Sequence, residues 1–236
     1  MSDTAASDSR WYLAIALLLI VPLVTLAISL IDKTGEDELA YGCDTLIKHY
    51  EAIDAQASLQ ANAILVLGDS RVTRWRDIPE RIAGLPVLAR GMPGLTIARV
   101  ADCFERAVAY YQPQMVLLWL SDTVLDGPVS HVTNNLATLR ERANYYSVSH
   151  TLIIAPPLET PAMGPDTVKV KRFSAALSGW AGIAPGVSII DISAPLRGDD
   201  GRPNPDFFWP DGRTLFEHGY HAINRWLESH VLTGNG

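Results

Sequence analysis

The sequence predicts an α/β domain built on a parallel β-sheet with helices on both faces, preceded by one transmembrane helix. Three features indicate this: one long apolar run near the N-terminus, short β-rich apolar segments, and longer amphipathic stretches between those segments. Continuous apolar strands that alternate with helices are typical of a parallel sheet buried on both faces. With 48% hydrophobic residues, 19% charged residues and a formal charge of −7, the composition excludes a polytopic membrane protein, a disordered chain and a disulfide-dense mini-protein.

The transmembrane helix is expected over residues 11–31, where 18 of 21 residues are hydrophobic and the exceptions are Pro22, Thr25 and Ser29. At about 1.5 Å per residue this run covers about 31 Å, enough to cross a bilayer core. A cleaved signal peptide is the alternative, because Ala27-Ile28-Ser29 fits a small-x-small cleavage site. Signal peptides usually have an apolar region of only about 7–15 residues, so we favour an uncleaved anchor.

The orientation of the anchor rests on domain size, because Arg10 and Lys33 flank it with one positive charge on each side. A short N-terminal tail before a large domain suits an N-inside anchor. We therefore expect a single-pass membrane protein whose soluble domain is extracytoplasmic, in the periplasm. The two cysteines, Cys43 and Cys103, could pair in such an oxidising compartment or remain buried thiols, and the sequence leaves both open.

The strands are expected in five short apolar runs, each rich in Val, Ile, Leu or Met. They are 64–67, 87–89, 115–120, 151–155 and 187–190. The intervening stretches are longer and amphipathic, which predicts helices at about 95–111, 130–147, 166–182 and 216–232. The whole chain then divides into a tail (1–10), the anchor (11–31), a polar, partly helical connector (32–61), the α/β domain (62–232) and a second tail (233–236).

The first candidate site lies where the first strand ends in Gly68-Asp69-Ser70. A turn at this point delivers the Ser70 hydroxyl to the carboxyl edge of the sheet at the start of a helix. The turn exposes Oγ, and a helix N-terminus favours developing negative charge, so Ser70 is a candidate nucleophile. The alternative is that Ser70 only caps the helix.

Two more loops follow at the same edge. Gly94 closes the loop 90–94 after the second strand, where a glycine lets a backbone N–H approach a substrate oxygen. Asp211 precedes a helix that carries His218, and a late acid of this kind can orient a base, as in a Ser-His-Asp arrangement. The alternatives are two turn glycines and a simple Pro-Asp-Gly turn.

These loops, in this order, make residues 62–230 resemble the SGNH (GDSL-type) hydrolase superfamily. The resemblance implies a flavodoxin-like three-layer sandwich. It gives Ser70 the roles of nucleophile and oxyanion donor, Gly94 the role of second donor through its backbone N–H, and Asp211 the role of orienting the base. Gly219-Tyr220 matches the last helix of the family. The activity implied is O-acyl chemistry on lipids, glycans or small esters.

The third block of the family, Gly-x-Asn-Asp, is altered in this chain. After the strand 115–120 the sequence runs Ser121-Asp122-Thr123, which places Thr123 at the asparagine position. Threonine could donate one hydrogen bond through a shorter arm, whereas the Asp122 carboxylate would repel an oxyanion. Loss of one oxyanion donor typically lowers the rate by about 10²–10³.

The catalytic histidine is missing from its expected position as well. In the family pattern Asp-x-x-His, the residue after Asp211 that matches histidine is Thr214. Threonine cannot act as a base near neutral pH. His218 lies about one helical turn further on, and it either reaches back toward Ser70 or is a solvent-exposed helical histidine; we favour the exposed position.

Arginines gather around the candidate site. Seven of them lie between Ser70 and Arg106, against four acidic residues. Arg71 and Arg90 flank the two best loops, and an arginine fork suits a carboxylate or phosphate. The alternative is a solvated helix face. No nucleic acid is expected, because the chain is acidic and carries no recognised module. No metal or other cofactor is expected either, because no His/Cys cluster has ligand spacing.

The sequence is compatible with two functions. The sequence favours a catalytically impaired or altered SGNH-like protein that serves as a binding or accessory subunit at the membrane surface. Its partner would be another membrane protein or an envelope polymer, and the small polar residues Thr25 and Ser29 would suit packing against another membrane helix. The alternative is an active serine esterase or O-acyltransferase acting on an extracytoplasmic glycan, lipid or small ester.

Overall fold

The computed structural model describes residues 43–56, 61–148 and 151–230, and side chains from His49 onward. The expected anchor and both expected tails lie outside these residues. Within the described part of the chain, no helix has the length and apolarity needed to cross a membrane.

The sheet has six strands in the order β2-β3-β1-β4-β5-β6, all parallel except β2. Their bounds are β1 Ile64–Gly68, β2 Arg81–Ile82, β3 Leu85–Gly91, β4 Met115–Trp119, β5 Thr151–Ala155 and β6 Val187–Ile189. The predicted α/β class and all five predicted strands are confirmed, and the two-residue β2 is an addition. Without β2, the order is that of flavodoxin-like sheets.

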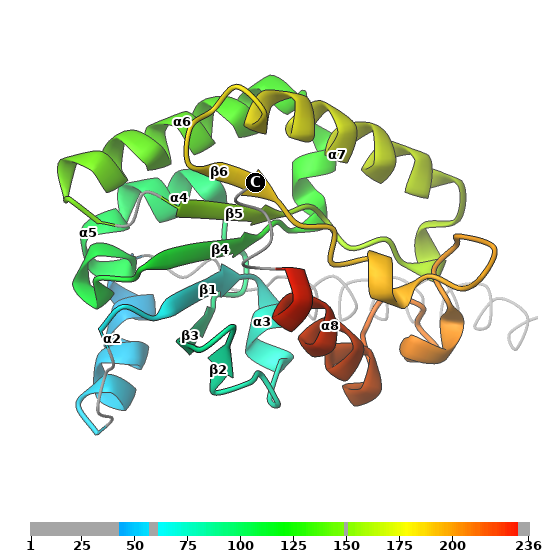
Figure 1. Cartoon of the computed structure of the whole chain (residues 1–236), viewed down its shortest axis with the longest axis horizontal. Coiled ribbons are helices and arrows are strands. Elements are labelled where there is room, and N and C mark those ends of the chain that lie inside the picture. The colour runs from blue at the N-terminus through cyan, green and yellow to red at the C-terminus, as the bar shows by residue number, and fades with distance from the viewer. Residues whose placement is uncertain (1–42, 57–60, 149–150, 231–236) are drawn as a thin grey trace, which may run out of the picture. The chain divides into compact units, whose positions relative to one another are not determined.

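Helices cover both faces of the sheet (Figure 1). One face carries α4 Ile97–Asp102, α5 Phe104–Ala107, α6 Val129–Tyr145 and α7 Thr167–Ala181, and the other carries α3 Ser70–Arg74 and α8 Glu217–His230. A further helix, α2 Cys43–Asp54, falls in the segment expected to be a connector. Short 3₁₀ turns complete the loops: η1 Ala109–Tyr111, η2 Asp122–Asp126, η3 Pro161–Asp166, η4 Ala194–Leu196 and η5 Pro205–Phe207.

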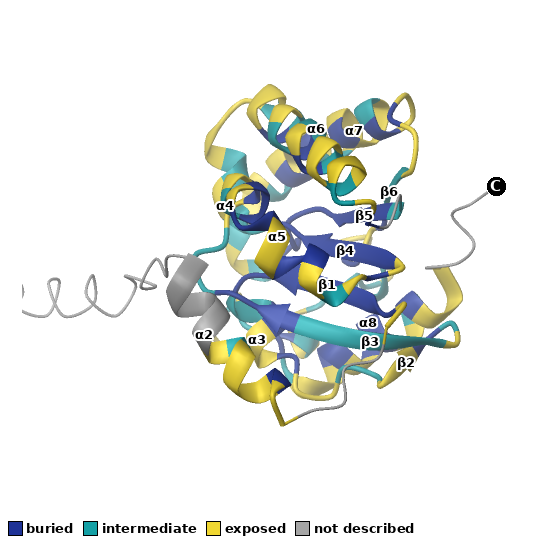
Figure 2. Ribbon diagram, turned by 90° about the vertical axis from the view of Figure 1, so that its left-hand side faces the viewer, coloured by how far each residue is buried: buried dark blue, intermediate teal, exposed yellow. Residues whose placement is uncertain are grey.

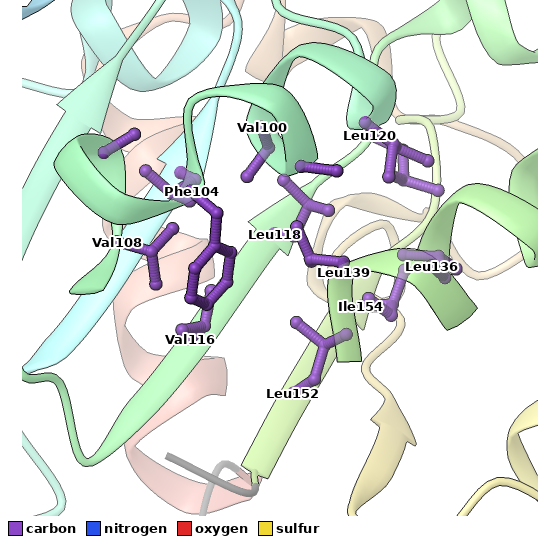
Figure 3. Close-up of a cluster of buried hydrophobic side chains, with 14 of the residues drawn as sticks. Val100, Phe104, Val108, Val116, Leu118, Leu120, Leu136, Leu139, Leu152 and Ile154 are labelled. Atoms are coloured by element: carbon purple, nitrogen blue, oxygen red, sulfur yellow. The ribbon is translucent and has the colours of Figure 1, made fainter. Parts of the chain in front are cut away.

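Alternate residues of the central strands pack into two separate cores. Leu65 and Leu67 of β1 pack with α4 to α7, whereas Ile64 and Val66 pack with α3 and α8. The central strands β1, β4 and β5 are buried along almost their whole length (Figure 2). Figure 3 shows the first core, where Phe104 lies beside Val116 between helix and sheet. Fully burying one such side chain stabilises the fold by about 1.5–3 kcal/mol, which explains the unbroken apolar runs.

The helix expected over 95–111 is divided into α4, α5 and η1. Thr96 caps α4 by accepting a hydrogen bond from the Arg99 N–H at 3.2 Å. The backbone then leaves helical geometry at Val108, with φ −128° and ψ −60°. Phe104 and Val108, four residues apart and on one helix face, are both buried in the first core. Cys103, between α4 and α5, is disulfide-bonded, whereas the side chain of Cys43 lies outside the described residues.

The strand order reverses between β1 and β4, which are neighbours although the chain visits β3 first. Connections leaving two such strands diverge to opposite sides of the sheet and open a crevice at the carboxyl ends. The loops that border this crevice begin at Gly68 and at Leu120. They carry Ser70 on one side and Thr123 on the other.

Candidate functional site

Ser70 is the first residue of α3, directly after β1. The helix cap is Asp69 rather than Ser70, because the Asp69 carboxylate accepts a hydrogen bond from the Arg71 N–H at 2.8 Å. Ser70 is therefore free of the capping role that the sequence left open. The residue is partly exposed at the carboxyl end of β1.

The partner of the Ser70 hydroxyl is an arginine. Nη2 of Arg74, one helical turn further along α3, donates a hydrogen bond to Ser70 Oγ at 2.6 Å. Among the described residues this is the one hydrogen-bond partner of Oγ. Arg74 is one of the seven arginines that the sequence places around the candidate site, and its i,i+4 spacing from Ser70 on one helix face was the signal that could have paired the two.

The loop of Gly94 lies beside the Ser70 turn. The Met92 N–H donates to the Gly68 carbonyl at 2.7 Å, which joins the two loops. Gly94 has a φ of 69°, a left-handed conformation that favours glycine. Gly91 is required by close approach instead, since a Cβ there would lie 2.2 Å from the backbone nitrogen of Thr73. Gly94 is therefore favoured by its backbone conformation and Gly91 by close packing.

Arg71 bridges the crevice. Its Nη1 donates to Asp69 Oδ2 at 3.1 Å, and its Nη2 donates to Asp122 Oδ2 at 2.6 Å, so it links the loop after β1 to the loop after β4. Burial alone would lower the pKa of Arg71, but the Asp122 and Asp69 carboxylates outweigh it and raise the pKa above the ordinary value. This guanidinium is permanently charged and already paired with two carboxylates.

Helix α8 contacts the same turn through Tyr220. The Tyr220 hydroxyl donates to the Arg71 carbonyl at 2.9 Å, and its ring stacks on Trp75 with 5.8 Å between centroids. Burial raises the pKa of Tyr220 to about 12, against the lowering effect of Arg74 and Arg71. Tyr220 is therefore a neutral donor at physiological pH, and its role here is to hold α3 in place.

Thr123, at the asparagine position, is bonded within its own loop. Its hydroxyl shares a hydrogen bond of 2.6 Å with the Ser121 hydroxyl. The neighbouring Asp122 presents one oxygen to Arg71, while its other oxygen, Oδ1, is buried and has no hydrogen-bond partner. A carboxylate beside the position where an oxyanion would form is unfavourable for that charge.

Asp211 is satisfied by the residue that replaces histidine. The Thr214 hydroxyl donates to Asp211 Oδ2 at 2.6 Å, and the backbone N–H groups of Thr214 and Arg213 donate to Oδ1 at 2.9 and 2.8 Å. These bonds hold the pKa of Asp211 below its ordinary value, with the Thr214 hydroxyl as the largest cause. The acid position is preserved, but it closes a turn instead of orienting an imidazole.

His218 contacts a different part of the domain. Its Nε2 lies 2.5 Å from the Asp206 carbonyl oxygen, and its exposed ring packs between Phe207 and Phe216 at centroid distances of 5.6 and 5.4 Å. His218 and Ser70 therefore have different hydrogen-bond partners: His218 bonds to Asp206, and Ser70 bonds to Arg74. His131 lines a cavity of about 200 Å³ that Thr123 also borders.

Arg90, the second candidate anion-binding residue, is buried. Its guanidinium bonds to Asp54 of α2, to the Tyr111 hydroxyl at 3.1 Å and to the Ala89 carbonyl at 2.8 Å. The Tyr50 ring lies 4.7 Å from it, and the Tyr50 hydroxyl donates to the Gly91 carbonyl. This network joins α2 to the sheet, which supports a structural role for Arg90.

A second ion-pair network at the same edge was missed by sequence reasoning. Arg197 donates to the buried Glu159 at 2.6 Å and to Asp191 at 2.7 Å. Burial would lower the pKa of Arg197, but the two carboxylates raise it above its ordinary value. The partners are up to 38 residues apart, so no local pattern could signal the network. It fastens together the loops after β5 and β6.

One group of described residues has the composition of a metal site. Ligand atoms of Asp77, Glu217 and His221 lie within 4.8 Å of one another, and all three side chains are exposed. His221 already pairs with Glu217 at 3.5 Å. Exposed acidic groups commonly gather in this way without an ion, so the group carries no metal assignment.

Solved structures with the same fold are numerous, although no protein-family model and no curated protein matches this sequence. A candidate platelet activating factor from Streptococcus pneumonia is 18% identical, with a TM-score of 0.65 over 88% of this chain and 99% of that chain. A GDSL-like lipase from Bacteroides thetaiotaomicron is 17% identical, with a TM-score of 0.63 over 79% and 97%. A lipase/acylhydrolase from Enterococcus faecalis is 18% identical, with a TM-score of 0.56 over 72% and 95%.

Each of these similarities covers nearly the whole of the other chain at low sequence identity. The sheet order, the Gly68-Asp69-Ser70 turn after β1 and the Gly94 loop after β3 agree with the same assignment. The chain therefore has the fold of the SGNH (GDSL-type) hydrolases.

Proposed function

We propose that the protein is a non-hydrolytic SGNH-fold binding protein, tethered to a membrane by residues 11–31 with its domain in the periplasm. It would serve as an accessory or binding subunit for another membrane protein or an envelope polymer. The observation that carries the proposal is the hydrogen bond from Arg74 to Ser70 Oγ at 2.6 Å. The expected nucleophile is held by a cation at the point where a hydrolase needs a base.

Nucleophilic serines are activated by a neighbouring base within about 2.6–3.2 Å of the hydroxyl proton. A guanidinium has no acceptor atom and stays protonated at physiological pH, so it cannot take that proton. Its hydrogen bond also draws electron density from Oγ. Arg74 therefore occupies a lone pair of Oγ without supplying the base that deprotonation of Ser70 needs.

The residues at the base and asparagine positions of the family pattern also support a non-hydrolytic protein. The Asp211 carboxylate is closed by Thr214, and the Thr123 hydroxyl is bonded to Ser121. A base and one oxyanion donor are thus both replaced by threonines with local partners. General-base catalysis typically contributes about 10²–10⁴ in rate, and one oxyanion donor about 10²–10³, so their joint loss favours binding without turnover.

The test uses the full-length protein in detergent micelles, with p-nitrophenyl acetate as substrate and a fluorophosphonate as a probe of activated serines. We expect no turnover above that of the Ser70→Ala variant and no labelling at Ser70. Ester hydrolysis that disappears in Ser70→Ala would overturn the proposal in favour of an active esterase. Both proteins are compared by circular dichroism, so that loss of fold is not mistaken for loss of activity.

A further inference from the structure

A polar cavity of about 320 Å³ lies beside the candidate site. It is bordered by η2, by η3 with the first turn of α7, and by the loop that carries Asp211; its lining residues are Asp122, Leu125, Asp126, Thr160, Ala162, Met163, Asp166, Lys169 and Arg213. Asp122 connects it to the Ser70 turn through Arg71. The Ala162 N–H donates to the Gly212 carbonyl at 3.1 Å, which joins η3 to the last loop. The cavity therefore lies at the same edge of the sheet as Ser70.

Two buried oxygens of the lining have no hydrogen-bond partner. They are Oδ1 of Asp122 and Oγ1 of Thr160, and Thr160 is only 1% exposed. Buried polar atoms in folded proteins almost always have a partner. A carboxylate oxygen only accepts hydrogen bonds, and a threonine oxygen both accepts and donates. A ligand that completes this lining must therefore supply hydrogen-bond donors.

The charges of the lining are mixed in sign. Asp122, Asp126 and Asp166 are negative, and Lys169 and Arg213 are positive. Two of the acids are already paired, Asp166 with Lys169 at 3.1 Å and Asp122 with Arg71 at 2.6 Å. A ligand with a formal charge would meet a like charge in this cavity. A neutral ligand with several hydroxyl groups donates to the carboxylates and accepts from the cations, so it suits both.

An exposed indole lies on the adjoining turn. Trp209 is 52% exposed, and its carbonyl accepts a hydrogen bond from the Gly212 N–H at 2.8 Å. Its ring is supported by Phe216 at 4.8 Å between centroids. A fixed aromatic ring on this turn, four residues before Arg213 of the cavity lining, offers an apolar surface for the C–H face of a sugar ring, while the hydroxyls of the sugar find partners in the cavity.

We infer that this cavity binds a sugar residue of a neutral polysaccharide. The inference rests on the proposed function, because it gives the non-hydrolytic site its ligand: an envelope polymer rather than a protein partner. The polymer would be held at the edge that carries Ser70, with one residue in the cavity.

The test is a calorimetric titration of the full-length protein in micelles with xylotetraose, cellotetraose and chitotetraose, each in turn. We expect at least one of these neutral oligosaccharides to bind. Thr160→Val keeps the shape of the side chain and removes the buried oxygen, so it should weaken binding by about 2- to 12-fold, the range of one hydrogen bond. The unliganded variant should unfold at the same temperature as the wild type or higher, because the lost hydroxyl has no partner.

The control is Thr138→Val, because Thr138 is exposed on α6, bonds to the Asn134 carbonyl and does not line the cavity. Its affinity should equal that of the wild type. Three results would overturn the inference: no binding of any of the three oligosaccharides, equal affinity in Thr160→Val, or binding of putrescine or inorganic phosphate in their place.

The two proposals fail in different ways. Ester hydrolysis that depends on Ser70 would contradict the non-hydrolytic function, independently of whether the calorimetry detects sugar binding. Absent or Thr160-independent sugar binding would sink the cavity assignment and leave the inactivity of Ser70 untouched.

Discussion

The turn that carries Ser70 and the loop that carries Asp211 lie at the same edge of one sheet, yet they differ in how much of the family pattern they keep. The first keeps Gly68-Asp69-Ser70 and the neighbouring Gly94 loop. The second keeps the acid but has Thr214 where the pattern has histidine. The difference separates residues that the fold needs from residues that only the chemistry needs.

The retained residues have structural roles in the fold. Asp69 caps α3 and pairs with Arg71. Gly91 allows β3 to approach α3, and Tyr220 holds the Arg71 carbonyl. Replacing any of them disturbs packing or capping, so the fold alone is a reason to keep them.

The altered positions have no such constraint. Thr214 is half-buried and bonds to Asp211 of its own loop, and Thr123 is exposed and bonds to Ser121 of its own loop. A histidine or asparagine at these positions is demanded by proton transfer and oxyanion binding, not by the core. A retained Gly-Asp-Ser turn is therefore weak support for activity by itself.

The largest expected effect comes from restoring the chemistry. We expect the double variant Thr123→Asn/Thr214→His to gain ester hydrolysis of at least about 10² over the wild type, because general base catalysis alone contributes about 10²–10⁴. The measurement is p-nitrophenyl acetate turnover by the full-length protein. The same variant with Ser70→Ala should fall back to background. If the double variant shows no more ester hydrolysis than the wild type, Thr123 and Thr214 are not the cause of the missing activity.

The next effect concerns a retained glycine. Gly91→Ala should lower the free energy of unfolding by about 1–3 kcal/mol, because the new Cβ would meet the Thr73 backbone. Gly179→Ala is the control: Gly179 lies within α7 with nothing within 4 Å of an added Cβ, so alanine should stabilise the helix by about 0.5–1 kcal/mol. Urea unfolding followed by tryptophan fluorescence measures both. Equal effects would remove the packing reason for Gly91.

A smaller loss is expected at the cap of α3. Asp69→Ala should destabilise the protein by about 1–2 kcal/mol, because the Arg71 N–H loses its acceptor. Asp69→Asn keeps a capping oxygen and removes only the charge, so it should retain most of that stability. The same urea titration distinguishes them. A loss in Asn as large as in Ala would assign the role of Asp69 to its ion pair with Arg71 instead.

The smallest effect is a titration shift in the altered loop. The pKa of Asp211 is lowered in the folded protein, chiefly by the Thr214 hydroxyl. The stability this contributes is present above the ordinary aspartate pKa and is lost as the pH falls through the lowered one. Thr214→Val should move the pKa of Asp211 up toward its ordinary value. Carboxyl chemical shifts in an NMR titration measure it, and an unchanged pKa would contradict the hydrogen bond.

Local sequence patterns predicted the parts of this molecule whose causes are local. The strands were found because each is an unbroken apolar run, and the Ser70 turn because it interrupts one. The helix expected to start at Ser70 is present as α3, but its end was not predicted because five residues are too few to show a helical period. The stretch predicted as one helix over 95–111 is divided into α4, α5 and η1, a break that its amphipathic pattern does not show.

The sequence by itself determined the α/β class, the order of the strands along the chain and the absence of histidine three residues after Asp211, since apolar runs and motif spacing are properties of neighbouring residues. Only the tertiary structure decided which partners the site residues take. It paired Arg74 with Ser70 Oγ, Arg71 with Asp122, and Arg90 with Asp54. It also assembled one cavity from three separate loops. The physical reason is that burial and hydrogen bonding depend on distances across the sheet edge, which the fold sets and the spacing of residues in the chain does not.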